Sequence, residues 1–184
     1  MKQLMLRSHS LWLVPVALTL AVFEPSATKA IAQTTYEFET VYNLEVTLRE
    51  IAPSISEVTV VGESANAPYG LTQLMSMNYS QFDPNTGVFT SGPDAAAFGL
   101  EGLPILTDKL FGSGEDSVIG TSNATLITDF ENLTGSGFGT LTITGGEGRF
   151  SDATGTLSLS DSFTLSPDPT APLRGQTLLS TEFR

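Results

Sequence analysis

Hydrophobic and polar residues alternate with a period of two over residues 36–49. One face carries Tyr36, Phe38, Tyr42, Leu44, Val46 and Leu48, and the other carries Glu37, Glu39, Asn43, Glu45 and Arg49. Successive side chains of a β-strand point to opposite sides of a sheet, whereas a helix would space its apolar residues at about 3.6. The pattern therefore predicts a long strand with one buried face, and Val58 and Val60 continue it in a second strand.

Similar short apolar stretches follow along the rest of the chain. We expect strands over 71–82, 124–130, 138–144, 156–165 and 173–183, with a bulge in the first of them. All 17 glycines lie between Gly62 and Gly175, where with serine and threonine they separate the apolar stretches. About seven to nine strands, short turns and no helical periodicity predict one all-β domain over residues 33–184, an antiparallel barrel or sandwich.

The segment Asp83-Pro-Asn-Thr-Gly87 joins two of these stretches. Proline presets the backbone for the second position of a turn and glycine accepts a positive φ, so the segment predicts a hairpin turn. A calcium loop using Asp83, Asn85 and Asp94 is the alternative. An EF-hand requires flanking helices, glycine at its sixth position and glutamate at its twelfth. Glycine is fifth here and Asp94 twelfth, so we favour the turn.

Residues 92–123 are the least regular part of the domain. We expect a helical turn at Asp94–Phe98 and a strand over Ile105–Phe111, each kept short by nearby glycines and by Pro104. Long irregular connections often carry binding or gating functions. We therefore expect any loop that covers a cavity to come from this stretch.

The first 32 residues have the layout of a secretion signal. Lys2 and Arg7 precede an apolar run of 13 residues, Leu11–Phe23, and a small-residue site ends at Ala32. This layout predicts cleavage after Ala32 and a secreted or periplasmic protein. The alternative, a retained membrane anchor, is disfavoured because so short a run, interrupted by Pro15, spans too little of a hydrocarbon core of about 30 Å. We expect no membrane insertion after cleavage.

Removal of this segment changes the chemistry available to the protein. His9 and Trp12 are lost with it, and the chain contains no cysteine, so residues 33–184 lack His, Cys and Trp entirely. Catalytic Ser-His-Asp or Cys-His groups and His/Cys zinc sites are thereby excluded. One acidic and three basic residues are also lost, which leaves 19 acidic and five basic residues and a net charge of −14. Nucleic acid is therefore not an expected partner.

Residues 140–157 read Thr-Leu-Thr-Ile-Thr-Gly-Gly-Glu-Gly-Arg-Phe-Ser-Asp-Ala-Thr-Gly-Thr-Leu, and we expect residues 145–148 to form a turn. The segment resembles the hairpin shared by allene oxide cyclases and plant dirigent proteins, and many bacterial secreted proteins carry a similar stretch. This resemblance implies a single antiparallel barrel of about eight strands with a central cavity. The matching residues are Gly145, Gly146, Gly148, Phe150, Ala153 and Gly155. They shape the turn and carry no chemistry, so no activity is implied.

Asp161 interrupts the apolar face formed by Leu157, Leu159, Phe163 and Leu165. An ionised carboxylate on such a face costs several kcal/mol unless it is paired. Asp161 is therefore a candidate cavity-lining acid or base. The alternative is a bulge or a place at the barrel rim that exposes it to water.

Arg149 is the second candidate for chemistry, because arginine binds carboxylates and phosphates well. We favour for it a surface ion pair with the neighbouring Glu147 or Asp152. Met75, Met77 and Tyr79 share one face of their strand and are candidate cavity-lining residues. Asn78 begins one of three Asn-x-Ser/Thr matches to the glycosylation pattern.

Three functions remain open from the sequence. We favour non-catalytic binding of a small apolar molecule in the barrel. The second is a cofactor-free isomerase or cyclase in which Asp161 or Arg149 supplies electrostatic stabilisation. The third is an acidic matrix protein that binds divalent cations weakly through carboxylates. None of the three requires a cofactor or a dedicated metal site, and the sequence does not determine the oligomeric state.

Overall fold

The computed structural model describes residues 34–166, 168 and 171–184. The chain divides into two units, Met1–Ala32 and Gln33–Arg184, and the predicted signal segment lies outside the described residues. Among the described residues, no helix has the length and apolar character needed to span a bilayer.

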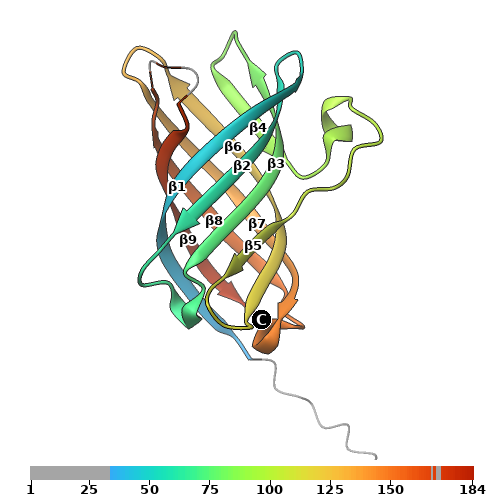
Figure 1. Cartoon of the computed structure of the whole chain (residues 1–184), viewed down its shortest axis with the longest axis vertical. Helices are drawn as coiled ribbons and strands as arrows, with labels where there is room; N and C mark the ends of the chain where they lie inside the picture. The colour runs from blue at the N-terminus through green and yellow to red at the C-terminus, as the bar shows by residue number, and fades with distance from the viewer. Residues whose placement is uncertain (1–33, 167, 169–170) are drawn as a thin grey trace, which may run out of the picture. The chain divides into compact units, whose positions relative to one another are not determined.

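The second unit is a closed antiparallel β-barrel, as the sequence predicts (Figure 1). The strands are β1 (Tyr36–Ala52), β2 (Ile55–Glu63), β3 (Gln73–Asp83), β4 (Val88–Gly92), β5 (Asp108–Phe111), β6 (Ser117–Asp129), β7 (Thr134–Glu147), β8 (Gly155–Thr164) and β9 (Leu173–Phe183). They pair in the order β2-β1-β9-β8-β7-β6-β4-β3, and pairing of β2 with β3 closes the ring. Closure leaves the wall without a free sheet edge.

One position in the wall is shared by two short strands. β4 pairs with Tyr79–Asp83 of β3, and β5 pairs with Gln73–Ser76 of the same strand. Both also pair with β6 on their other side. Nine strands therefore make a ring of eight positions, and the chain leaves the wall after Gly92 and returns at Asp108.

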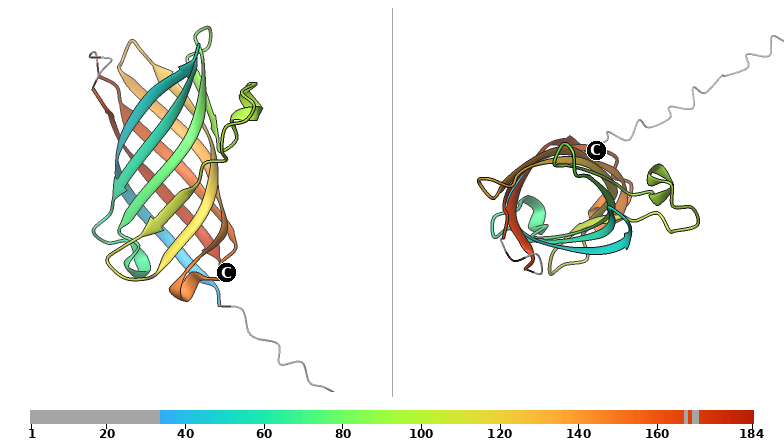
Figure 2. Two further views of the ribbon diagram at one scale, coloured as in Figure 1. Left: turned by 45° about the vertical axis from the view of Figure 1, so that its right-hand side comes forward. Right: turned by 90° about the horizontal axis from the view of Figure 1, so that it is seen from above.

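The segment between β4 and β5 lies outside the barrel, as both views of Figure 2 show. It contains the short turn η2 (Ala95–Phe98), in which the Ala96 amide donates to the carboxylate of Asp94 at 2.9 Å. The helical turn expected here is therefore present. The expected longer strand is not, because only Asp108–Phe111 pairs with the wall.

The alternation in β1 separates the inside of the barrel from the outside. Phe38, Tyr42, Leu44 and Val46 are buried, and the polar residues between them are exposed apart from Thr40. The register of β2 with β3 is continuous, so the bulge expected in residues 71–82 is absent. The Asp83–Gly87 turn is confirmed: the Gly87 amide donates to the Asp83 carbonyl at 2.9 Å, and Gly87 has a φ of 71°.

Aromatic rings fill one end of the barrel. The Tyr36 ring lies 4.9 Å from that of Phe150, 5.3 Å from Phe183 and 5.4 Å from Tyr69, measured between centroids. Tyr69 belongs to the turn η1 (Pro68–Gly70), and Phe150 ends the turn η3 (Gly148–Phe150). Edge-to-face and stacked pairs of this kind pack densely and exclude water. We call these four residues the aromatic plug.

The glycine-rich segment holds Phe150 in the aromatic plug. Gly145 and Gly146 belong to β7 and not to the turn expected over residues 145–148. The turn proper begins at Gly148, which has a φ of 62°. A Cβ on Gly146 would lie 2.1 Å from the Ser117 carbonyl oxygen, so only glycine permits this close approach of backbones.

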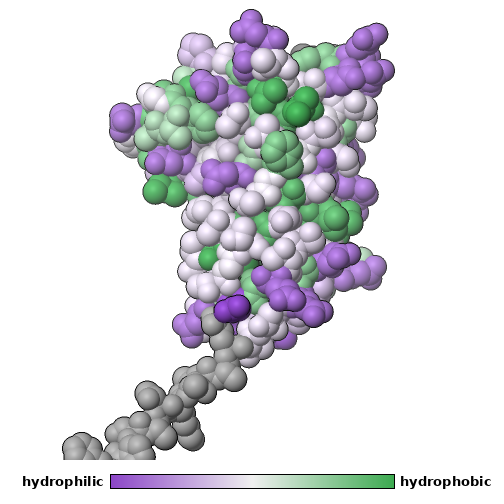
Figure 3. All heavy atoms as spheres, turned by 180° about the vertical axis from the view of Figure 1, so that it is seen from behind, coloured by the Kyte–Doolittle hydropathy of each residue, from purple (hydrophilic) through white to green (hydrophobic). Residues whose placement is uncertain are grey.

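The outer face of the barrel mixes small polar residues with isolated apolar ones. In the view of Figure 3, apolar side chains are scattered among pale and hydrophilic ones. Charged pairs on the surface include Arg49–Glu57 and Arg174–Glu45, with nitrogen–oxygen distances of 2.7 and 3.4 Å. Exposed pairs like these contribute about 0–1 kcal/mol each, so the barrel depends mainly on its interior.

Candidate functional site: the barrel cavity

The barrel encloses a cavity of about 130 Å³ above the aromatic plug. Eight-stranded barrels have room inside for side chains or for one small ligand. A cavity of about 150 Å³ in another protein holds benzene, so this one suits a compact ligand of similar size. Lining residues near the plug, such as Leu141 and Leu179, are buried. Leu48, at the other end, is 43% exposed, so the cavity opens there.

One side of the cavity wall is apolar. Its residues come from four adjacent strands, β2, β1, β9 and β8, and they are Leu44, Val46, Leu48, Val58, Val60, Leu159, Phe163, Leu173 and Leu179. Burial of apolar ligand surface against such a wall is favourable by roughly 25 cal/mol per Å². This side provides the affinity for an apolar group.

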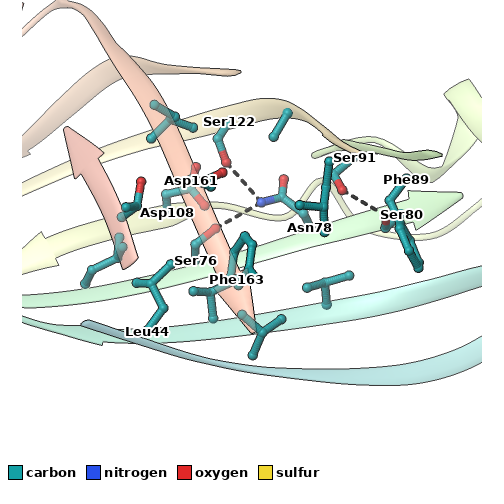
Figure 4. Close-up of a pocket in the computed structure, with 18 of the residues that line it drawn as sticks. Leu44, Ser76, Asn78, Ser80, Phe89, Ser91, Asp108, Ser122, Asp161 and Phe163 are labelled. Atoms are coloured by element: carbon teal, nitrogen blue, oxygen red, sulfur yellow. Dashed lines mark hydrogen bonds between the residues drawn. The ribbon is translucent and has the colours of Figure 1, made fainter. Parts of the chain in front are cut away.

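The opposite side carries a polar cluster among the apolar residues Leu74, Phe89, Ala124, Leu126 and Leu141. Asn78 of β3 donates from Nδ2 to Ser76 Oγ at 2.9 Å and to Ser122 Oγ of β6 at 3.0 Å, and Ser91 Oγ lies 2.8 Å from Ser80 Oγ (Figure 4). Strands β3 and β6 flank the position shared by β4 and β5, where backbone pairing is interrupted. The Asn78–Ser122 bond therefore links two strands across the break in the wall.

Asp108 is the first residue of β5 and points into the cavity beside this network. It is 2% exposed, and neither carboxylate oxygen has a partner of hydrogen-bond geometry. Burial raises the pKa of Asp108, and the neighbouring hydroxyls of Ser76 and Ser122 and the Met77 amide oppose only part of that rise. An acid held in this state is a common feature of binding and catalytic sites.

Asp161 also lines the cavity, from β8, where Thr177 of β9 lies opposite it in the register. The carboxyl group points inward (Figure 4), so it is neither turned outward by a bulge nor confined to an exposed rim. Burial raises the pKa of Asp161, and the Thr177 hydroxyl lowers it slightly without reaching hydrogen-bond geometry. Two carboxyl groups with raised pKa values thus face one cavity.

The assignment of Met75, Met77 and Tyr79 to the cavity wall is wrong. The lining residues of β3 are those of the opposite face, Leu74, Ser76, Asn78 and Ser80. Met75 is 43% exposed on the outer surface. Tyr79 is buried because the segment between β4 and β5 covers it from outside, where its hydroxyl donates to the Pro104 carbonyl at 3.0 Å. That segment therefore covers an outer face of the wall.

Arg149 lies outside the cavity. Its guanidinium pairs with Asp116 at 2.6 Å, and its backbone amide donates to the same carboxylate at 2.9 Å. The expected partners were Glu147 and Asp152, but Glu147 pairs with Lys109 instead, at 2.7 Å. The role of Arg149 in this structure is to fasten the η3 turn to the residues before β6.

The carboxylates of the described residues form no group of three or more that could hold a metal ion. Asp83 accepts hydrogen bonds from the Asn85 amide at 2.9 Å and from Thr86 Oγ1 at 2.8 Å, which lower its pKa. Asp94 caps η2. The residues considered for a calcium loop are thus used by two separate turns.

Comparison with known proteins gives no match to a family profile, to a curated protein or to a solved structure.

Proposed function

We propose that this protein binds a small, largely apolar molecule inside its barrel and carries it without altering it. The observation that supports this most directly is the cavity of about 130 Å³, one side of which is apolar apart from Asp161 and Thr177, closed by the aromatic plug and open at the other end. The signal-like layout of the first 32 residues supports a role outside the cytoplasm, in a periplasm or in the medium. The resemblance of the glycine-rich hairpin to the allene oxide cyclase and dirigent barrels is consistent with a ligand cavity.

Titration with toluene tests the proposal, because this molecule fits the cavity and has no polar group. We expect saturable binding in saturation-transfer NMR and calorimetry. Ala124 lines the cavity on β6. Its replacement by Phe should fill the cavity and weaken toluene binding at least about tenfold, a loss of about 1.4 kcal/mol of binding free energy. Thr140→Phe, on the exposed outer side of β7, is the matched control and should bind as the wild type does. Equal binding by all three proteins would place the toluene site elsewhere and contradict the proposal.

A second candidate function is a cofactor-free isomerase with Asp161 as the base, and the raised pKa of this cavity-lining carboxyl group favours it. A buried carboxylate can remove a proton next to a carbonyl group and return it at another carbon of the same substrate. We expect such an enzyme to convert cyclohex-3-enone to its conjugated isomer, measured by ultraviolet absorbance. Asp161→Asn should abolish the conversion and Asp152→Asn should not. The absence of acceleration by the wild-type protein, or an unchanged rate in Asp161→Asn, would eliminate this candidate.

A further inference from the structure

The buried side-chain nitrogen and oxygen atoms that lack a hydrogen-bond partner in the described part of the chain belong to three residues. They are Asn78 Oδ1, both carboxylate oxygens of Asp108, and Thr177 Oγ1. All three residues line the same cavity. Folded proteins pair nearly all their buried polar atoms, and each unpaired one costs about 1–3 kcal/mol. Because they gather around one cavity, we infer that a polar group of a ligand supplies their missing hydrogen bonds.

These free atoms select the kind of polar group that fits. The Asn78 amide nitrogen is already engaged with Ser76 and Ser122, so its carbonyl oxygen is the free atom. An ionised Asp108 carboxylate can only accept hydrogen bonds. Three of the four free atoms are therefore acceptors, and a ligand must bring donors to them. An ammonium group carries three N–H donors and no acceptor.

Charge favours the same group. Among the described residues, the cavity lining contains Asp108 and Asp161 and no lysine or arginine. Arg49, Lys109, Arg149 and Arg174 are each paired with a carboxylate on the outer surface. The cavity therefore attracts cations and repels anions. A cation beside Asp108 would also favour the ionised form of its carboxyl group, which burial disfavours.

We propose that the ligand is a small primary amine whose ammonium group contacts Asp108 and the Asn78 carbonyl oxygen while its apolar body lies against the leucine and valine wall. This inference rests on the proposed binding function and specifies its ligand. Asp108 supplies the charge, and Asn78 is held in place by its two serine partners. Thr177 and Asp161 lie on the side of β8 and β9, where a second polar atom of the ligand would meet them.

Three molecules of nearly equal size test the inference by calorimetry at pH 7: benzylamine, benzyl alcohol and benzoate. We expect benzylamine to bind at least about tenfold more tightly than benzyl alcohol, because its hydrogen bonds to a carboxylate are charge-assisted. Benzoate should bind most weakly. Asp108→Asn should remove the preference for benzylamine, so that the variant binds benzylamine and benzyl alcohol with affinities within about twofold of each other. Asp152→Asn makes the same change of charge at an exposed position and should retain the preference.

The outcomes separate this inference from the binding function itself. If the wild type binds benzylamine and benzyl alcohol equally and Asp108→Asn changes neither affinity, the proposal of an amine ligand is overturned. The proposed binding of an apolar molecule would remain. No binding of either compound, together with no binding of toluene, would overturn both. Carboxyl-detected NMR of the wild-type protein provides a test that needs no variant. The Asp108 side-chain carbonyl should shift on addition of benzylamine and not of benzyl alcohol, and the reverse result contradicts the inference.

Discussion

Replacement of Asp108 by Asn should raise the free energy of unfolding at pH 7 by about 2 kcal/mol, because it removes a buried carboxyl group whose ionised form burial disfavours. Asp108 is 2% exposed, and neither carboxylate oxygen has a hydrogen-bond partner. An asparagine has nearly the same shape, and its amide can donate to the serine hydroxyls beside it. Urea denaturation of both proteins measures the difference. Asp152→Asn, at an exposed position, should change stability by no more than about 0.5 kcal/mol.

The stability advantage of Asp108→Asn over the wild type should increase as the pH rises. Burial raises the pKa of Asp108, so the folded protein holds this proton at pH values where the unfolded chain has lost it. The free energy of unfolding of the wild type therefore falls, relative to the variant, as pH rises through that window. Below about pH 3.9, the ordinary value for aspartate, both states are protonated and the two proteins should be equally stable. A difference that grows as the pH is lowered would contradict the burial of an uncompensated Asp108.

The site that we propose for an amine is thus expected to cost stability. If Asp108→Asn is more stable and has also lost the preference for benzylamine, the carboxylate is retained for binding and not for folding. Benzylamine should then stabilise the wild type more than the variant in the same denaturation experiment, since a ligand that binds only the folded state raises its stability.

Gly146→Ala should destabilise the barrel by about 3 kcal/mol, at the upper end of the usual cost of overpacking. The added Cβ would lie 2.1 Å from the Ser117 carbonyl oxygen and 2.7 Å from that of Phe150. Both are backbone atoms, so relief requires β6 to separate from β7 or η3 to move away, which displaces Phe150 from the aromatic plug. Thermal and urea unfolding measure the loss.

Gly145→Ala is the matched control for this variant. The neighbouring glycine lies in the same strand, but a Cβ there meets nothing closer than 3.8 Å. We expect a change of no more than about 0.5 kcal/mol. Equal losses at the two positions would show that the effect comes from glycine's backbone freedom and not from the close approach of β6 and β7.

The sequence alone determined the fold class, most strand positions and the available chemistry. Alternation is a local property of the sequence. In β1 it identified the inward residues correctly, because side chains alternate with a period of two and the hydrophobic set is the one that faces the barrel interior. The same reasoning made Asp161 a candidate cavity residue, with a bulge or a rim position as the alternative, and the structure places it in the cavity lining. The Asp83–Gly87 turn followed from proline, glycine and side-chain geometry within five residues.

Only the tertiary structure decided which face of β3 is the inside. The alternation along β3 predicts two faces but does not say which face lies inside the barrel. Because Met75, Met77 and Tyr79 are the more hydrophobic set, the sequence made them the candidates for the inner face. The opposite face, with Ser76, Asn78 and Ser80, lines the cavity. Tyr79 is buried on the outer face instead, because the segment between β4 and β5 covers it there.

Asp108 was not found from the sequence for a related physical reason. It lies where the chain returns to the wall at β5, a strand too short to show a periodic pattern. Its neighbours in space, Ser76 and Ser122, are distant from it in the sequence. Pairing across the ring brings them together. Local sequence therefore determined the strands and the available chemistry, while closure of the ring, a non-local event, decided which polar groups face the cavity.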